Sequence, residues 1–205
     1  MERESQLGII ILAAGKASRM GNPKALLPYK GHSFLQNTFY LAQSVNPQAI
    51  ITVLGHYSDQ MSAHCKQYNI PYVLNIAYEE GMSTSIRCGL NQLLYYHPSL
   101  KSVLILLADQ PKIVSGHLMK MIFNLSNNPV KMVCTSYGGT SGVPAIFKQD
   151  LFHDLLQLKG EKGAKDLIRK NMNCEQNIVA CEEGYIDIDT PEDYNQLILA
   201  EKLYK

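Results

Sequence analysis

The sequence predicts an α/β protein in which a mostly parallel central sheet carries helices on both faces. Short apolar runs alternate with longer amphipathic segments, as in successive strand–helix–strand units. Several of these runs are continuous and rich in Ile, Val and Leu, which is typical of strands buried on both faces. A chain of 205 residues can bury one full-sized core, so we expect a single domain over residues 1–205.

The predicted strands are short apolar runs, each bounded by polar residues, glycine or proline. In chain order they are residues 8–13, 49–55, 71–75, 102–108, 131–136, 143–147 and 185–188. The segment 136–144, SYGGTSGVP, is rich in glycine and is expected to be a loop.

Capping residues indicate where four of the helices begin. Ser33 with Gln36 three positions later forms a capping box before an apolar face of helical period. Ser83 and Ser115 are expected to cap the next two helices. Thr190-Pro191-Glu192-Asp193 combines a cap, a first-turn proline and acidic residues, and opens the last helix.

Charge and composition narrow the class of protein. The net charge is +1, so bulk electrostatics predicts neither nucleic acid nor a membrane as a partner. The N-terminal apolar run is too short for a signal peptide, and no stretch approaches the length of a spanning helix. The five cysteines are scattered without C-x-x-C spacing, which favours a reducing, cytoplasmic location. They are Cys65, Cys88, Cys134, Cys174 and Cys181.

A glycine-rich turn follows the first predicted strand and carries three cations. Gly15 and Gly21 flank Lys16 and Arg19, and Lys24 comes shortly after. Backbone N–H groups in such a turn can form an anion nest, and Lys or Arg can neutralise a polyphosphate. The spacing matches neither a Walker A loop nor the dinucleotide fingerprint G-x-G-x-x-G. The turn therefore predicts a phosphate site of another kind, with a solvated surface turn as the alternative.

Acidic residues follow two other predicted strands. Asp109 ends the run at 102–108, where it could cap the next turn or bind Mg²⁺, which commonly takes only one or two protein carboxylates. Asp187 and Asp189 are two apart and share one face if the chain is extended. A nearby cation would relieve their repulsion, although Asp189 could instead help to cap the last helix.

The segment LAAGKASRMGNPKALLPYKG resembles the signature of the MobA-like nucleotidyltransferases, and its LAAG resembles the molybdenum cofactor cytidylyltransferase branch. This resemblance implies a Rossmann-like domain of the nucleotide-diphospho-sugar transferase type. It implies that Arg19 and Lys24 are catalytic and bind the phosphates of a nucleoside triphosphate. Residues of the preceding turn would then contact the nucleotide, and they are Leu12, Ala13, Ala14, Gly15 and Lys16.

Two further segments resemble acidic elements of the same family. LLADQP at 106–111 is similar to its L-x-x-D-x-P element, which implies that Asp109 is catalytic and binds Mg²⁺. DIDTPED at 187–193 is similar to its second acidic element, which implies that Asp187 or Asp189 completes the metal site.

The remaining similarities concern the base and the acceptor. GMSTSIRCGL at 81–90 resembles a base-reading segment whose serine-rich form accompanies cytosine, which implies that Ser83 and Ser85 bind the nucleotide. Arg87 could face phosphate or lie on the helix surface. The G-x-P loop of the family holds a pterin-bearing substrate, but Val143 stands where many cytidylyltransferases have histidine. The segment 158–171 is also family-like, and its Glu161 and Lys165 are spaced as a solvated helical pair.

The predicted reaction is transfer of CMP from CTP to the phosphate of molybdopterin or its molybdenum-loaded form, with Mg²⁺ as cofactor and release of pyrophosphate. A molybdenum hydroxylase would be the protein partner. Two alternatives remain: a nucleotidyltransferase acting on a sugar or polyol phosphate, and a nucleotide-binding chaperone that inserts the cofactor into a molybdenum hydroxylase.

Overall fold

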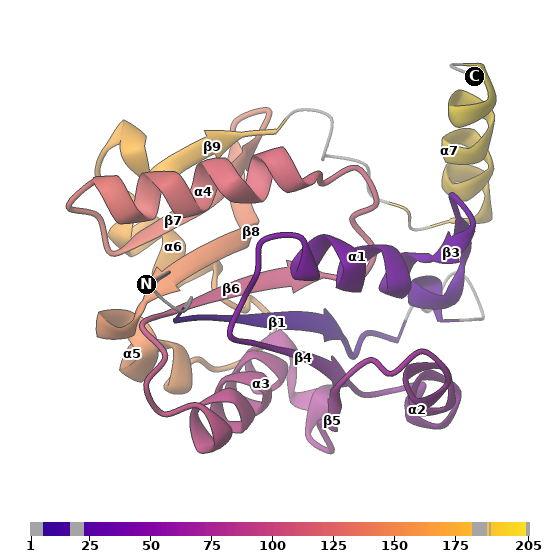
Figure 1. Ribbon diagram of the computed structural model, residues 1–205, viewed down its shortest axis with the longest axis horizontal. Coiled ribbons are helices and arrows are strands. Elements are labelled where there is room, and N and C mark those ends of the chain that lie inside the picture. The colour runs from indigo at the N-terminus through magenta and orange to yellow at the C-terminus, as the bar shows by residue number, and fades with distance from the viewer. Residues whose placement is uncertain (1–5, 17–22, 182–187, 189, 204–205) are drawn as a thin grey trace.

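A computed structural model describes residues 6–16, 23–181, 188 and 190–203. In this part of the chain the main sheet has seven strands, and Figure 1 shows it at the centre of the molecule. Across the sheet the strands are β5 (Tyr72–Leu74), β4 (Ala49–Leu54), β1 (Leu7–Ala13), β6 (Ser102–Leu107), β8 (Thr140–Lys148), β7 (Met132–Tyr137) and β9 (Ile178–Ala180).

The sheet is mostly parallel, as predicted. Strand β1 pairs in parallel with β4 on one side and with β6 on the other. Strand β8 runs antiparallel to both of its neighbours, β6 and β7. The chain therefore passes from β1 to opposite sides of the sheet, and ligands of open α/β sheets bind at such a switch point, beyond the carboxyl ends of the strands.

The helices connect the strands and cover both faces of the sheet. They are α1 (Phe34–Gln43), α2 (Ser58–Gln67), α3 (Met82–Tyr96), α4 (Ser115–Asn127), α5 (Phe152–Leu156), α6 (Lys165–Asn171) and α7 (Pro191–Leu203). Short 3₁₀ helices lie at η1 (Lys24–Leu26), η2 (Tyr78–Glu80), η3 (Gln149–Leu151) and η4 (Glu175–Asn177), and β2 (Pro28–Tyr29) forms a small hairpin with β3 (His32–Ser33).

Alternate residues of each buried strand face opposite cores. Ile9 and Ile11 of β1 pack in a cluster with apolar residues of α1, α2 and α4. Ile10 and Leu12 pack in a second cluster with residues of α3, α5 and α6. Because both faces of β1 are buried, its sequence is a continuous apolar run and does not alternate with polar residues.

Helix α7 lies at one end of the molecule, beside β3 and away from the main sheet (Figure 1). A third apolar cluster joins it to the hairpin. We call this cluster, made of Tyr29, Phe34, Ile188 and Leu197, the C-terminal cluster. In addition, the Tyr194 hydroxyl donates a hydrogen bond to the Pro28 carbonyl over 2.6 Å.

The capping predictions are confirmed in part. Ser33 forms the predicted capping box with Gln36 at the start of α1. The predictions for Ser83 and Ser115 are wrong, since α3 begins at Met82 after Gly81 and α4 begins at Ser115 itself. A glycine with positive φ and an extended residue occupy those cap positions, and neither supplies a side-chain oxygen.

The predicted loop at 136–144 is mostly strand. Strand β7 continues to Tyr137, the turn consists of Gly138 and Gly139, and β8 begins at Thr140. The glycines mark a tight hairpin here, which composition alone does not distinguish from a loop. The predicted strand at 185–188 falls outside the described residues except for Ile188, which is not in a strand.

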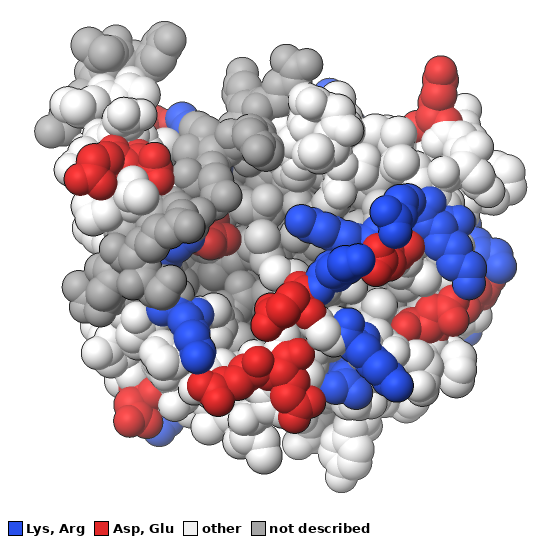
Figure 2. All heavy atoms as spheres, turned by 180° about the vertical axis from the view of Figure 1, so that it is seen from behind, with Lys and Arg blue, Asp and Glu red and all other residues white. Residues whose placement is uncertain are grey.

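Charged side chains of both signs lie side by side on the face seen from behind in Figure 2. This mixture agrees with the formal net charge of +1. Within the described residues, none of the helices is long and apolar enough to cross a membrane.

Candidate active site

The carboxyl ends of three parallel strands meet at one cavity. In the strand register, Ala13 of β1 lies beside Leu54 of β4, and Leu12 lies beside Leu107 of β6. The residues directly after β1 and β6, Ala14 and Ala108, consequently open onto the same space. The cavity there has a volume of about 620 Å³, which is in the range of small-molecule sites.

A lysine and a carboxylate face each other in this cavity. Lys24 begins η1, and its Nζ atom lies 3.8 Å from Oδ2 of Asp109. The Lys24 side chain is 13% exposed and that of Asp109 is 37% exposed, so the lysine is the more enclosed of the two. The sequence separates these residues widely, and the parallel pairing of β1 with β6 brings the loops that carry them together.

Several predicted nucleotide contacts line the same cavity. They are Leu12, Ala13, Ala14, Gly15, Lys16, Lys24, Ser85 and Asp109. Ser83 and Arg87 do not line it. Arg19, Asp187 and Asp189 lie outside the described residues, so their predicted roles stay predictions.

The cavity also contains acidic residues that sequence reasoning missed. Glu79 pairs with Lys16 over 3.1 Å, and this hydrogen bond raises the pKa of Lys16 above its usual value. Glu161 lines the cavity from the loop between α5 and α6. The alternative interpretation of Glu161 and Lys165 as a solvated helical pair does not hold, since α6 begins only at Lys165. Asp166 pairs instead with Lys162 and Arg169.

A buried amide fixes the hydroxyl groups at the start of α3. Asn75, which follows β5, accepts a hydrogen bond from the Ala77 N–H through Oδ1. Its Nδ2 therefore donates to Thr84 Oγ1 over 2.8 Å and to Ser85 Oγ over 3.0 Å. Ser85 is 4% exposed and lines the cavity, with its oxygen already accepting from Asn75. The hydroxyl proton of Ser85 is thus available as a donor to a ligand.

Ser83 holds a loop against α3. It is fully buried, and its hydroxyl donates to the Gly160 carbonyl over 2.7 Å. The Ser83 N–H donates to the same carbonyl over 3.2 Å. Ser83 therefore positions the loop that carries Glu161 rather than facing the cavity. Arg87 lies on the same helix, and its Nε is buried with no hydrogen-bond partner among the described residues.

Replacing Gly81 by alanine is expected to destabilise the fold. Gly81 has a φ of +110°, and a Cβ there would lie 2.6 Å from backbone atoms of Gly160. Both the strained dihedral and the backbone contact oppose a side chain, so Gly81→Ala should lower the free energy of unfolding by about 1–3 kcal/mol. Denaturant unfolding monitored by circular dichroism measures this change.

The matched control is Gly116→Ala in α4. A Cβ at Gly116 has no neighbour within 4 Å, and alanine is preferred to glycine within a helix. We expect this variant to be at least as stable as the parent chain. A Gly81→Ala variant of unchanged stability would contradict the close packing of the Gly160 loop on α3.

Strand β8 is tied at Val143 to Gln110, the residue after Asp109. The Tyr137 hydroxyl donates to the Val143 carbonyl over 2.6 Å, and Gln110 Nε2 donates to it over 3.2 Å. Burial raises the pKa of Tyr137 to about 12, so this hydroxyl keeps its proton at neutral pH. Val143 and Pro144 are joined by a cis peptide bond. The segment predicted to bind the acceptor therefore lies next to the loop that carries Asp109.

Asp109 fits the requirements of a divalent cation that is held jointly with phosphate. Within the described residues, no group of three or more His, Cys, Asp or Glu side chains could hold a metal ion alone. Mg²⁺ commonly takes one or two carboxylates and completes its shell with waters and substrate phosphates. Asp109 is a partly exposed carboxylate beside Lys24, a side chain that can bind phosphate, and this arrangement suits that donor set.

Residues 9–176 match the family model described as "MobA-like NTP transferase domain". Among curated proteins, the chain is 27% identical over 197 residues to "Purine catabolism protein PucB" of Bacillus subtilis, covering 92% of this chain and 94% of PucB.

Two solved structures of a mycobacterial protein are also similar. Rv0371c from Mycobacterium tuberculosis H37Rv superimposes with a TM-score of 0.77 at 27% identity, covering 96% of this chain and 99% of that one. A complex of Rv0371C with manganese gives a TM-score of 0.73 at 25% identity, covering 94% of this chain and 98% of that one.

Proposed function

Because the chain belongs to the MobA-like NTP transferase family, and is thus a nucleotidyltransferase, we propose that it transfers CMP from CTP to the phosphate of a molybdopterin-type acceptor. The observation that carries the proposal is the meeting of Lys24 and Asp109 in one cavity at the carboxyl ends of β1 and β6. The Lys24 ammonium and the Asp109 carboxylate are 3.8 Å apart, so one ligand can contact both. The lysine would bind phosphate oxygens, and the carboxylate would bind a divalent cation.

In the proposed reaction an oxygen of the acceptor phosphate forms a bond to the α-phosphorus of CTP. The bond from that phosphorus to the bridging oxygen breaks, and pyrophosphate leaves with the electron pair. The acceptor phosphate is already an anionic nucleophile, so no covalent enzyme intermediate is required. The protein then contributes in-line positioning and neutralisation of the phosphate charge. Lys24 serves both purposes, together with Arg19 as predicted from the sequence.

A divalent cation, Mg²⁺ by our proposal, would neutralise phosphate charge when bound. Asp109 would hold it, together with Asp187 or Asp189 as predicted from the sequence. The complex of the similar Rv0371C with manganese supports the use of a divalent cation.

The acidic residues in the cavity favour a base that carries an amino group. Glu79 and Glu161 offer only hydrogen-bond acceptors when ionised, whereas Ser85 offers a donor. Cytosine presents an amino donor beside ring and carbonyl acceptors, which complements this set. Uracil has a carbonyl in place of the amino group, and that carbonyl would face a carboxylate.

Replacing Glu161 by glutamine should weaken the preference for CTP over UTP. The amide can donate as well as accept, so it tolerates the uracil carbonyl. A change of one hydrogen bond in the difference between CTP and UTP corresponds to a drop of about two- to tenfold in the ratio of kcat/KM values. The matched control is Glu80→Gln, an exposed neighbour of Glu79 that does not line the cavity. An unchanged ratio in Glu161→Gln would exclude this residue from base selection.

The acceptor is tested by measuring pyrophosphate release with each of the four ribonucleoside triphosphates, with and without molybdopterin. Of the four triphosphates, we expect only CTP to release pyrophosphate, and we expect this release only when molybdopterin is present. Release that requires a sugar phosphate or polyol phosphate would contradict the proposed acceptor. Binding of CTP without any release would instead favour a role in delivering the cofactor to a molybdenum hydroxylase. The presence of both Lys24 and Asp109 in the cavity argues for turnover, since binding alone does not need the pair.

A further inference from the structure

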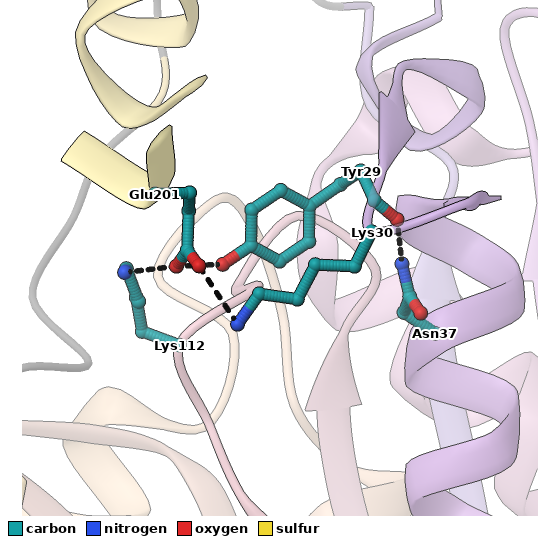
Figure 3. A network of polar contacts seen from close by, with 5 residues as sticks. All are labelled: Tyr29, Lys30, Asn37, Lys112 and Glu201. Carbon is teal, nitrogen blue, oxygen red and sulfur yellow. Dashed lines mark hydrogen bonds and ion pairs between the residues drawn. The ribbon is translucent and has the colours of Figure 1, made fainter. Parts of the chain in front are cut away.

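One carboxylate joins the last helix to two segments that leave the cavity. Glu201 of α7 accepts hydrogen bonds at Oε1 from the Tyr29 hydroxyl and from Lys112 Nζ, each over 2.6 Å. Its other oxygen, Oε2, lies 3.1 Å from Lys30 Nζ. Figure 3 shows the three donors converging on the carboxylate from two segments, one that carries Tyr29 and Lys30 and one that carries Lys112. We call Tyr29, Lys30, Lys112 and Glu201 the Glu201 clasp.

The clasp holds together the two segments that follow Lys24 and Asp109. Tyr29 lies in β2, which follows directly after the 3₁₀ helix that begins with Lys24. Lys112 and Asp109 lie on the same loop, which follows β6. Glu201 Oε1 therefore bridges the segment after Lys24 and the segment after Asp109. None of the four clasp residues lines the cavity itself.

The clasp has the character of a fixed structural contact. The hydrogen bonds from Lys112 and then from Tyr29 and Lys30 lower the pKa of Glu201 to about 2, so the carboxylate is ionised at neutral pH. Burial raises the pKa of Tyr29, which is 3% exposed, so the phenol keeps the proton that it donates. The C-terminal cluster packs beside these polar contacts and holds α7 on the hairpin.

We propose that Glu201 is a positioning residue of the nucleotide site, which sets the separation of Lys24 and Asp109 by cross-linking the segments that follow them. The inference rests on the proposed function for its catalytic consequence, but not for its structural one. Some residues orient a metal- or substrate-binding group without touching the metal or substrate themselves. Replacing such a residue commonly lowers affinity or activity by about tenfold or more. A helix that merely covers the hairpin would affect stability alone.

The test compares Glu201→Gln with Glu192→Gln. Both replace a glutamate of α7 by its isosteric amide, but Glu192 is exposed at the start of the helix and lies outside the clasp. Binding is measured by calorimetry with Mg²⁺ and a CTP analogue whose α–β bridging oxygen is replaced by methylene. We expect the analogue to bind Glu201→Gln about tenfold to a hundredfold more weakly than the parent chain. Glu192→Gln should bind it with unchanged affinity.

Hydrogen exchange provides a second measurement that needs no ligand. The Ala108 N–H donates to the Leu12 carbonyl and the Ile113 N–H donates to the Gln110 carbonyl, so both amides report on the loop after β6. Exchange at these two amides should be faster in Glu201→Gln than in Glu192→Gln. If the parent chain binds no triphosphate, but exchange at the two amides is faster in Glu201→Gln, the proposed function is contradicted. The structural role of Glu201 in joining the two segments is then still supported.

Lys112→Met is the second variant, because Glu201 then keeps Tyr29 and Lys30 and α7 stays docked. If the clasp acts as a unit, the loss of binding free energy for the analogue in the Lys112→Met/Glu201→Gln double variant should be smaller than the sum of the losses in the two single variants. The proposal is overturned if both single variants bind the analogue as tightly as the parent chain, or if exchange at the two amides matches Glu192→Gln.

Discussion

Replacing Asp109 by asparagine is expected to abolish pyrophosphate release while the chain remains folded. Asparagine keeps the shape of the side chain but removes the charge that would hold a divalent cation next to the phosphates. Removal of one electrostatic contact to a reacting phosphate lowers turnover by about a hundredfold or more. Steady-state release of pyrophosphate from CTP measures the loss, and near- and far-ultraviolet circular dichroism monitors the fold.

The control for this variant is Asp150→Asn, which changes an exposed aspartate that does not line the cavity. It should release pyrophosphate at the parent rate. The proposed metal role of Asp109 would be excluded by an Asp109→Asn variant that keeps full activity at every concentration of Mg²⁺.

Replacing Lys24 by methionine should produce the second large loss. The Lys24 side chain is largely enclosed, and its Nζ lies 3.8 Å from Oδ2 of Asp109 in the cavity. Methionine fills much of the same volume without the charge, so the β- and γ-phosphates would lose a donor in a poorly hydrated place. We expect kcat/KM for CTP to fall by about a hundredfold.

Lys131→Met is the matched control, because Lys131 is exposed and does not line the cavity. An equal and small effect of the two substitutions would mean that Lys24 serves only to pair with Asp109. A rise in KM without a change in kcat would instead mean that Lys24 binds substrate and transition state equally.

Much of the fold follows from local patterns in the sequence. Continuous apolar runs predicted β1, β4 and β6, because a strand buried on both faces needs no alternation. The Ser33 capping box predicted the start of α1, because its contacts join residues only three positions apart. Helix α2 was not predicted, because only Met61 and Cys65 of its ten residues are buried and its apolar face is weak. The antiparallel direction of β8 depends on a two-glycine hairpin that composition alone read as a loop.

The site could be predicted where it depends on strand ends. Lys24, Asp109 and the turn after β1 meet because β1 and β6 are parallel neighbours, which the α/β pattern already indicates. Asn75 was missed although it too follows a strand, because its role depends on hydroxyls of α3 that only the folded chain brings near. Glu161 was missed because its helical spacing to Lys165 suggested a solvated helix, whereas the loop packs on Gly81.

Following the α-phosphorus of CTP shows whether the group transferred is CMP. CTP with a radioactive α-phosphate is incubated with the protein, Mg²⁺ and molybdopterin, and the products are separated by chromatography. We expect the label to move to the pterin product in equal amount to the unlabelled pyrophosphate released, and to stay in CTP when Asp109 is replaced by asparagine. Label that remains in CTP with the parent chain, or appears only as free CMP, would contradict the account.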